Sequence, residues 1–218
     1  MRIRPHLLVM AMLLVASSVN AKEVLDSLKY IFPEFTQGTV IFADKQISRG
    51  MLNISPMNQC VYCLSPEKDT LAVAGTAPIV SVSVAGRTFL RWKESFVEII
   101  TKGTGTGVGI TRTTTMVNNV KTGPFGMNTA TSSVKSYSVN AETRSLTNLI
   151  IDDPRNYVYA RTACLLNNGK VYPVSRKSFE KVFPEKKDYI ESVWPGLNLV
   201  PTDIDAVLSF YKELLEQQ

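Results

Sequence analysis

The sequence predicts an α+β protein: an antiparallel β-meander forming a small barrel or sandwich, followed by a C-terminal β-hairpin and two to three packed helices. Three observations predict this class. Short segments rich in Val, Ile, Phe and Thr recur between residues 38 and 100, separated by turn residues. An Asn-Gly pair at 168–169 separates two further segments of this kind. Residues 204–215 carry apolar side chains at steps of three and four, which is typical of an amphipathic helix.

Residues 1–21, MRIRPHLLVMAMLLVASSVNA, have the pattern of a secretory signal peptide. Arg2 and Arg4 precede an apolar run, and Val19 and Ala21 are the small residues that favour cleavage after position 21. The run is shorter than the roughly 20 residues that a membrane-spanning helix needs. We therefore expect an exported protein, periplasmic or extracellular and soluble after cleavage, with no membrane span. Cleavage removes two arginines and no acid, so the net charge falls from +5 to +3.

Histidine chemistry is excluded from the mature chain. His6 is the only histidine, and it leaves with the signal peptide. Ser-His-Asp and Cys-His nucleophilic sites and histidine-ligated zinc all require an imidazole. Carboxylate, lysine, tyrosine and thiol chemistry remain open.

The segment from 22 to 102 is predicted as a short helix followed by the β-meander. Val24, Leu25 and Leu28 have helical spacing, and Pro33 ends that run. Val80, Val82 and Val84 alternate with serines, which predicts a strand with one dry and one wet face. The expected strands are GTVIFA, QISRGMLNI, QCVYCL, TLAVA, IVSVSVA, RTFLRW and SFVEII.

Residues 103–150 differ in composition and are predicted as a Gly/Thr/Ser-rich, basic extension that is partly mobile. From 101 to 150 the charged residues give a balance of +4, with Glu142 the one acid. If the protein binds an anionic partner, this segment is where we expect it to bind. The competing interpretation is a solvated connection without a ligand. The candidate ligand-binding residues are Arg112, Lys121, Lys135 and Trp92.

Residues 151–218 are predicted as a hairpin plus helices, packed either as a separate unit or with 22–102. Asn168-Gly169 supplies the positive φ angles of a tight turn. Ser175 is expected to cap a short helix, Pro184 to begin a second, and Thr202 to cap the last.

The glycine-rich stretch KGTGTGVGI, residues 102–110, does not fit a nucleotide-binding loop. Valine occupies position 108, where a dinucleotide fingerprint requires glycine, and strand-like sequence follows instead of a helix. Spacing of two places the glycines on one strand face, where another backbone can come close. No cofactor is expected.

Two alternative functions involve glycans. A carboxylate-based glycan hydrolase would use Asp152, Asp153, Glu94 or Glu98. A glycan-binding module would need an aromatic platform, for which the candidates are Trp92 and Trp194 with Tyr62, Tyr137, Tyr157 and Tyr159. The basic residues from Arg176 to Lys187 alternate with acids, as on a solvated helix surface, and the chain is expected to be exported; no nucleic-acid partner is therefore expected.

The motif QCVYC, residues 59–63, predicts a strand and not a redox site, because no helix follows it. With Cys164 as the one further cysteine and no histidine, no metal site is expected. Two interpretations stay open: free thiols that act as small apolar residues, or a disulfide from Cys60 or Cys63 to Cys164.

Residues 167–193, NNGKVYPVSRKSFEKVFPEKKDYIESV, and 197–215, LNLVPTDIDAVLSFYKELL, resemble the C-terminal part of uncharacterised exported proteins of Bacteroidetes bacteria. LKYIFPEFTQGTVIFAD, residues 28–44, and NNVKTGPFGMNTATSSVKSYS, residues 118–138, are similar to their N-terminal and middle parts. The resemblance implies export and the same architecture, and it carries over no site residues. The leading hypothesis is an exported, non-enzymatic protein that binds another protein or an anionic envelope component.

Overall fold

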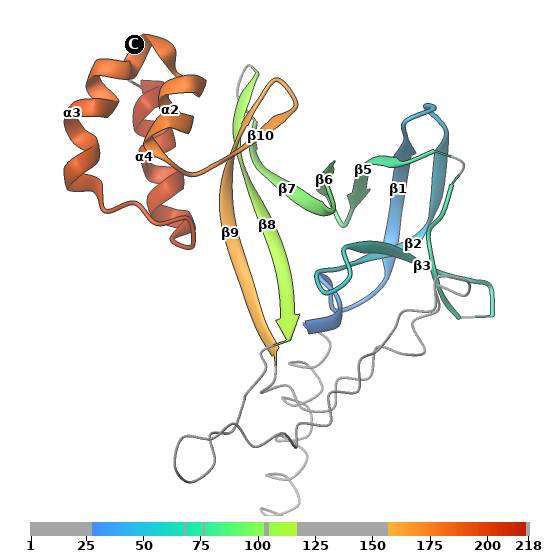
Figure 1. The fold of residues 1–218 in the computed structure, drawn as a ribbon. Helices are drawn as coiled ribbons and strands as arrows, with labels where there is room; N and C mark the ends of the chain where they lie inside the picture. The colour runs from blue at the N-terminus through green and yellow to red at the C-terminus, as the bar shows by residue number, and fades with distance from the viewer. Residues whose placement is uncertain (1–27, 68, 76, 103–104, 117–156, 217–218) are drawn as a thin grey trace, which may run out of the picture. The chain divides into compact units, whose positions relative to one another are not determined.

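The structure, a computed structural model, describes residues 28–67, 69–75, 77–102, 105–116 and 157–216 (Figure 1). Within these residues the chain forms a mostly antiparallel, open sheet of ten strands and three α-helices, which confirms the α+β class. The strands are hydrogen-bonded in the order β10-β9-β8-β7-β6-β5-β1-β2-β3-β4. Closure into a barrel or sandwich stays a prediction, and the expected signal peptide lies outside the described residues.

Two compact units divide the chain. Of the described residues, the first unit contains those within 28–35, 53–73, 114–116 and 157–158, and the second contains those within 36–52, 74–113 and 159–216. The seven strands expected between 38 and 100 are all present, as β1 (Thr36–Phe42), β2 (Ile47–Ser55), β3 (Cys60–Leu64), β4 (Thr70–Ala72), β5 (Ile79–Val84), β6 (Arg87–Trp92) and β7 (Ser95–Lys102).

In the first unit, the buried side chain of Asn53 holds the segment around Phe32 against the end of β2. Its amide oxygen accepts the backbone N–H of Phe32 at 3.2 Å, and its amide nitrogen donates to the Phe32 carbonyl at 2.8 Å. The Ile31 N–H also donates to the carbonyl of Ile54. These bonds satisfy backbone groups that would otherwise be buried without partners. Of the helix expected from residue 22, the described part is helical at 28–29, and bends follow.

In the second unit, β1 pairs with β2 on one side and with β5 on the other. The predicted dry face is correct for Val82 and Val84, which are buried, but wrong for Val80, which is 45% exposed. The register shifts at the end of β1: Ile41 pairs with Ser81 and Phe42 pairs with Ile79, which leaves Val80 without a partner opposite it. This extra residue is a β-bulge, and a bulge re-aims the side chains around it.

The next strand, β8 (Thr106–Met116), is an 11-residue strand where the sequence predicted a partly mobile extension. Its glycines allow it to pack closely, as their spacing predicted. A Cβ on Gly109 would lie 2.5 Å from Val97 Cγ1 and 3.2 Å from Cys164 Sγ. The buried side chains on this side of the sheet form a small apolar cluster, against which Trp92 and Ile99 pack: Val97, Cys164, Leu166 and Val171.

The strands β9 (Tyr157–Asn167) and β10 (Lys170–Pro173) pair antiparallel, with Lys170 opposite Asn167. Asn168 and Gly169 between them have φ angles of 49° and 76°. Positive φ at both central residues is the geometry of the tight turns that Asn-Gly favours.

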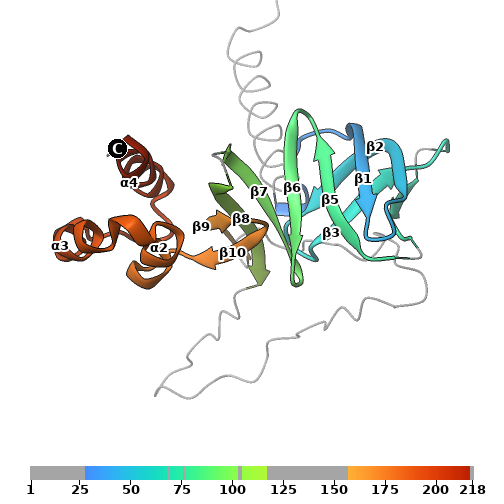
Figure 2. The same ribbon diagram turned by 90° about the horizontal axis from the view of Figure 1, so that it is seen from above.

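Three helices follow, grouped together in both views (Figures 1 and 2): α2 (Arg176–Val182), α3 (Lys187–Leu197) and α4 (Ile204–Glu216), with the 3-10 turn η4 (Pro184–Lys186) before α3. Ser175 caps α2 as predicted, since its hydroxyl accepts the N–H of Ser178. The predicted cap of α4 is wrong by one residue: Asp203, not Thr202, accepts the N–H of Ala206 at 3.0 Å. Phe179, Phe210 and Leu214 form the centre of the helical core.

None of the helices among the described residues is long and apolar enough to cross a membrane.

Candidate functional site at the β6–β7 hairpin

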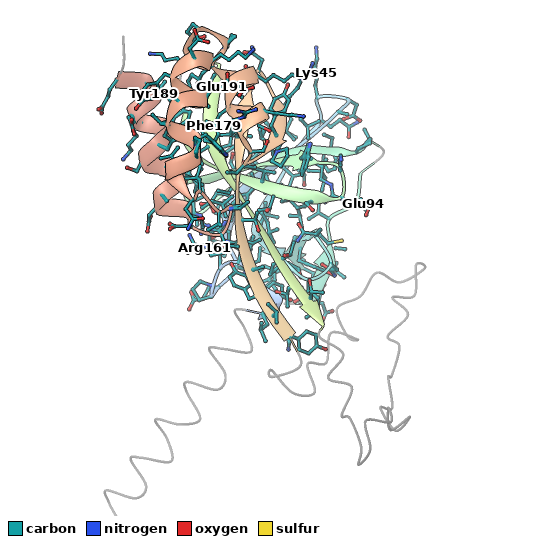
Figure 3. The ribbon with its side chains drawn as sticks, turned by 60° about the vertical axis from the view of Figure 1, so that its left-hand side comes forward. Lys45, Glu94, Arg161, Phe179, Tyr189 and Glu191 are labelled. Carbon is teal, nitrogen blue, oxygen red and sulfur yellow. The ribbon has the colours of Figure 1, made fainter. Side chains whose placement is uncertain are left out.

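A two-residue turn, Lys93-Glu94, joins β6 to β7 in the second unit, and the strands pair from Trp92 opposite Ser95 onward. The side chains of both turn residues are exposed, and Lys93 adopts a positive φ of 54°. Glu94 marks this turn in Figure 3, and Lys45 marks the turn between β1 and β2.

Two cations are held over aromatic rings at this turn. The Lys93 ammonium lies 5.0 Å from the centre of the Trp92 ring. The Arg91 guanidinium lies 4.7 Å from the centre of the Phe96 ring, and its Nε donates to the Lys93 carbonyl at 3.1 Å. A cation is attracted to the negative face of an aromatic ring. The hairpin therefore presents two positive charges, each stabilised by the face of an aromatic ring.

Trp92, predicted as a ligand-binding residue, lies at this hairpin. Its ring is half-buried and packs against the apolar cluster of Val97 and Cys164. Trp194 packs instead in the helical core, with ring centres 5.8 Å from Phe179 and 6.2 Å from Phe210. The two tryptophans therefore contact different cores and do not form a shared platform for sugars. Tyr62 is buried, and Tyr137 lies outside the described residues.

Behind the hairpin, Glu98 is 4% exposed and lies between two arginines. Both of its carboxylate oxygens accept from Arg87, and Oε2 also accepts from Arg112. Burial raises the pKa of Glu98, but the hydrogen bond from Arg87, the charges of both arginines and the hydrogen bond from Arg112 together hold this pKa below its usual value of 4.5. The carboxylate is thus ionised at neutral pH and joins β6, β7 and β8.

Arg112, another predicted ligand-binding residue, therefore has a structural role. Its side chain is 9% exposed and donates to Glu98 inside the sheet. Lys121 and Lys135, the remaining two candidates, lie outside the described residues.

The glycan-hydrolase alternative finds little support in this geometry. Glu98 is ionised and bound by two guanidinium groups, so it has no proton to give to a leaving group. Glu94 is four residues away along an extended hairpin, roughly 13 Å between Cα atoms, and its side chain is exposed at the turn whereas Glu98 is buried. Asp152 and Asp153 lie outside the described residues.

None of the three cysteines forms a disulfide in the structure. Cys60 and Cys63 are half-buried on β3, a strand as predicted. Cys164 is buried in the second unit, and burial raises its pKa to about 12 in spite of a hydrogen bond with the Gly109 backbone. Because Cys60 and Cys164 belong to different units, a bridge between them stays a prediction. Within the part of the chain that the structure describes, no group of three His, Cys, Asp or Glu could hold a metal ion.

Charge is distributed unevenly within the second unit. Its strands and their turns, residues 36–52, 74–113 and 159–173, hold nine Lys or Arg against three acids, a net charge of +6. Residues 174–218, which contain the helices, hold six Lys or Arg and eight Asp or Glu, a net charge of −2. Positive charge is therefore concentrated on the sheet of this unit.

Arg91 and Lys93 were not among the binding residues predicted from the sequence. A signal for them existed in the run RTFLRWK, residues 87–93, where cations alternate with aromatic residues along one strand. The binding residues were instead predicted mainly within residues 101–150, because that segment has a net positive charge.

The chain matches no family model, no curated protein and no solved structure. Its resemblance to exported Bacteroidetes proteins stays a prediction.

Proposed function

We propose that the protein is an exported, non-enzymatic binding protein that holds an anionic component of the cell envelope on the sheet of its second unit. The observation that carries this proposal is the β6–β7 hairpin, where Arg91 and Lys93 are positioned over the rings of Phe96 and Trp92. A cation fixed by an aromatic ring loses less conformational freedom when it binds an anion, so more of the attraction appears as affinity.

The charge distribution supports the same function. The net charge of +6 on the sheet of the second unit draws anions toward the hairpin, while the acidic helices do not compete for them. Export supports an envelope component as the partner, because residues 1–21 have the features of a signal peptide and direct the mature chain to the periplasm or the cell exterior.

The proposal is tested with the mature chain, residues 22–218, and two polymers that share one backbone: dextran sulfate and neutral dextran. We expect binding to dextran sulfate that weakens with added salt, and no binding to dextran. If dextran sulfate is not bound at low salt, the proposed function is wrong.

The site itself is tested with the double variant Arg91→Gln, Lys93→Gln. It should weaken dextran sulfate binding about tenfold or more, because two positioned charges are lost. The matched control, Lys177→Gln with Lys187→Gln, removes the same charge from two exposed helical lysines. Equal losses in the two variants would show that net charge alone governs binding and that the hairpin is not the site.

A further inference from the structure

One end of the sheet in the second unit gathers exposed apolar side chains beside cations. We call this end the rim: residues 41–47, 79–80 and 91–95. At the rim β1 ends and β2 begins, β5 begins, and β6 turns into β7. The exposed apolar residues there are Ile47 at 58%, Val80 at 45% and Ile41 at 38%.

The strand register places most of these side chains on one face. Ile41 pairs directly with Ile47 across β1 and β2. Ile41 also pairs with Ser81, and Ser81 pairs with Leu90. Directly paired residues share a face of the sheet, and residues two apart on a strand do so as well. Trp92, two residues beyond Leu90, therefore lies on the face that carries the isoleucine pair.

On β1, β2, β5 and β6 this face carries one cation and no acid. Arg49 is on it, two residues from Ile47. The rim turns add Lys45 and Lys93, both exposed. The same two turns contain the acids Asp44 and Glu94. The Asp44 carboxylate accepts the backbone N–H of Gln46 at 3.0 Å, and this hydrogen bond holds the carboxylate against its own turn.

We infer that the anionic envelope component is a lipid surface, on which the rim docks by inserting Ile41, Ile47 and Val80 while its cations contact the headgroups. This inference rests on the proposed function and names its partner. Aliphatic side chains beside lysines and a tryptophan are the residues that lie at a bilayer interface, where the apolar part enters the acyl boundary and the charged group stays with the phosphates.

The size of the apolar area favours a lipid surface over a protein partner. A stable protein interface covers about 800 Å² on each partner. Three aliphatic side chains at the end of a sheet are too few to form the core of such an interface, but they suffice for shallow insertion that is reinforced by nearby charges.

The test measures co-sedimentation of the mature chain with phosphatidylglycerol–phosphatidylethanolamine vesicles and with phosphatidylcholine vesicles. We expect binding to the anionic vesicles, and at least tenfold weaker binding for Ile41→Thr with Ile47→Thr, since each buried aliphatic side chain contributes a factor of about ten or more. Threonine keeps the β-branched shape that strands favour, so the fold is retained. Equal urea midpoints for this variant and the wild type would verify that the fold is retained.

The matched control, Leu71→Thr with Val158→Thr, removes two exposed apolar side chains from the first unit, where they are 47% and 53% exposed. Loss in the rim variant alone, with dextran sulfate binding unchanged, supports the inference. Equal loss in both variants would indicate unspecific adsorption and overturn it. Absence of vesicle binding while dextran sulfate is bound overturns the lipid assignment and leaves the proposed function standing, whereas absence of both overturns both.

Discussion

Replacing Glu98 with glutamine should destabilise the protein strongly at neutral pH. The carboxylate accepts from Arg87 and Arg112 and is 4% exposed, so the substitution leaves two guanidinium groups facing a neutral amide. Removing one partner of a buried ion pair costs about 3–5 kcal/mol. Arg87 is 33% exposed and can be partly solvated, which places the expected loss near the lower end, about 3 kcal/mol.

The loss should depend on pH in a defined direction. The pKa of Glu98 in the folded protein is held below its usual value of 4.5, which the unfolded chain retains. A depressed pKa contributes stability that is present above the unfolded value and is lost as the pH falls through the folded value. Wild type and Glu98→Gln should therefore differ most at pH 7 and converge only once the pH falls below the depressed pKa of Glu98, where the wild-type carboxyl is protonated as well.

Urea unfolding followed by circular dichroism measures both effects. A loss of about 3 kcal/mol lowers the midpoint by roughly 1–3 M. The control, Glu94→Gln, changes an exposed turn residue of the same hairpin and should stay within about 0.5 kcal/mol of wild type. If the two variants unfold alike at pH 7, or if the difference grows toward acid pH, the role assigned to the ion pair is refuted.

Three other substitutions or measurements test the packing of the second unit. Gly109→Ala places a methyl group 2.5 Å from Val97 Cγ1 and should lower the free energy of unfolding by about 2 kcal/mol. The control is Gly50→Ala, whose added methyl group has its nearest neighbour 4.0 Å away, and it should be neutral or slightly stabilising. Equal urea midpoints for the two variants would contradict this. Cys164, with its pKa raised to about 12, should be the last thiol alkylated by iodoacetamide at pH 8, and denaturation without reductant should expose three thiols; a count of one would instead support a disulfide. Ser175→Ala should lower the urea midpoint by the equivalent of about 1 kcal/mol because α2 loses its cap, and an unchanged midpoint would show that the cap is dispensable.

The strands were predictable because their composition is a local property, whereas register is not. Val, Ile, Phe and Thr between turn residues were enough to predict β1 to β7. The exposure of Val80 was not predictable, because one unpaired residue opposite the junction of Ile41 and Phe42 changes the direction of the side chains, and nothing in IVSVSVA announces it.

Strand register also explains why the role of Arg112 was not predicted from the sequence. Arg112 was predicted to bind a ligand because cations dominate its neighbourhood in the sequence. In the structure it donates to Glu98, a residue 14 positions earlier, because β7 and β8 pair with Glu98 opposite Ile110. Residues two apart on β8 share a face, so the register brings the two charges together. An ion pair between strands requires that register, which the composition of either segment does not contain.

The turns of the rim combine strain with positive charge, and this links the docking surface to a cost in stability. Lys45 and Lys93 have φ angles of 67° and 54°, a region that glycine and asparagine enter more readily. A side chain with a Cβ costs roughly 1–2 kcal/mol in this conformation. If Lys93 is retained for its charge, Lys93→Asn should stabilise the protein by about 0.5–1 kcal/mol while weakening its binding to dextran sulfate and to anionic vesicles. Urea unfolding of this variant measures the gain in stability, and the two binding assays measure the loss of affinity. A Lys93→Asn variant that is more stable and binds both ligands as tightly as the wild type would show that Lys93 does not contribute to binding. The control is Ala85→Gly, at a φ of 50° in the turn between β5 and β6, which relieves strain without removing charge.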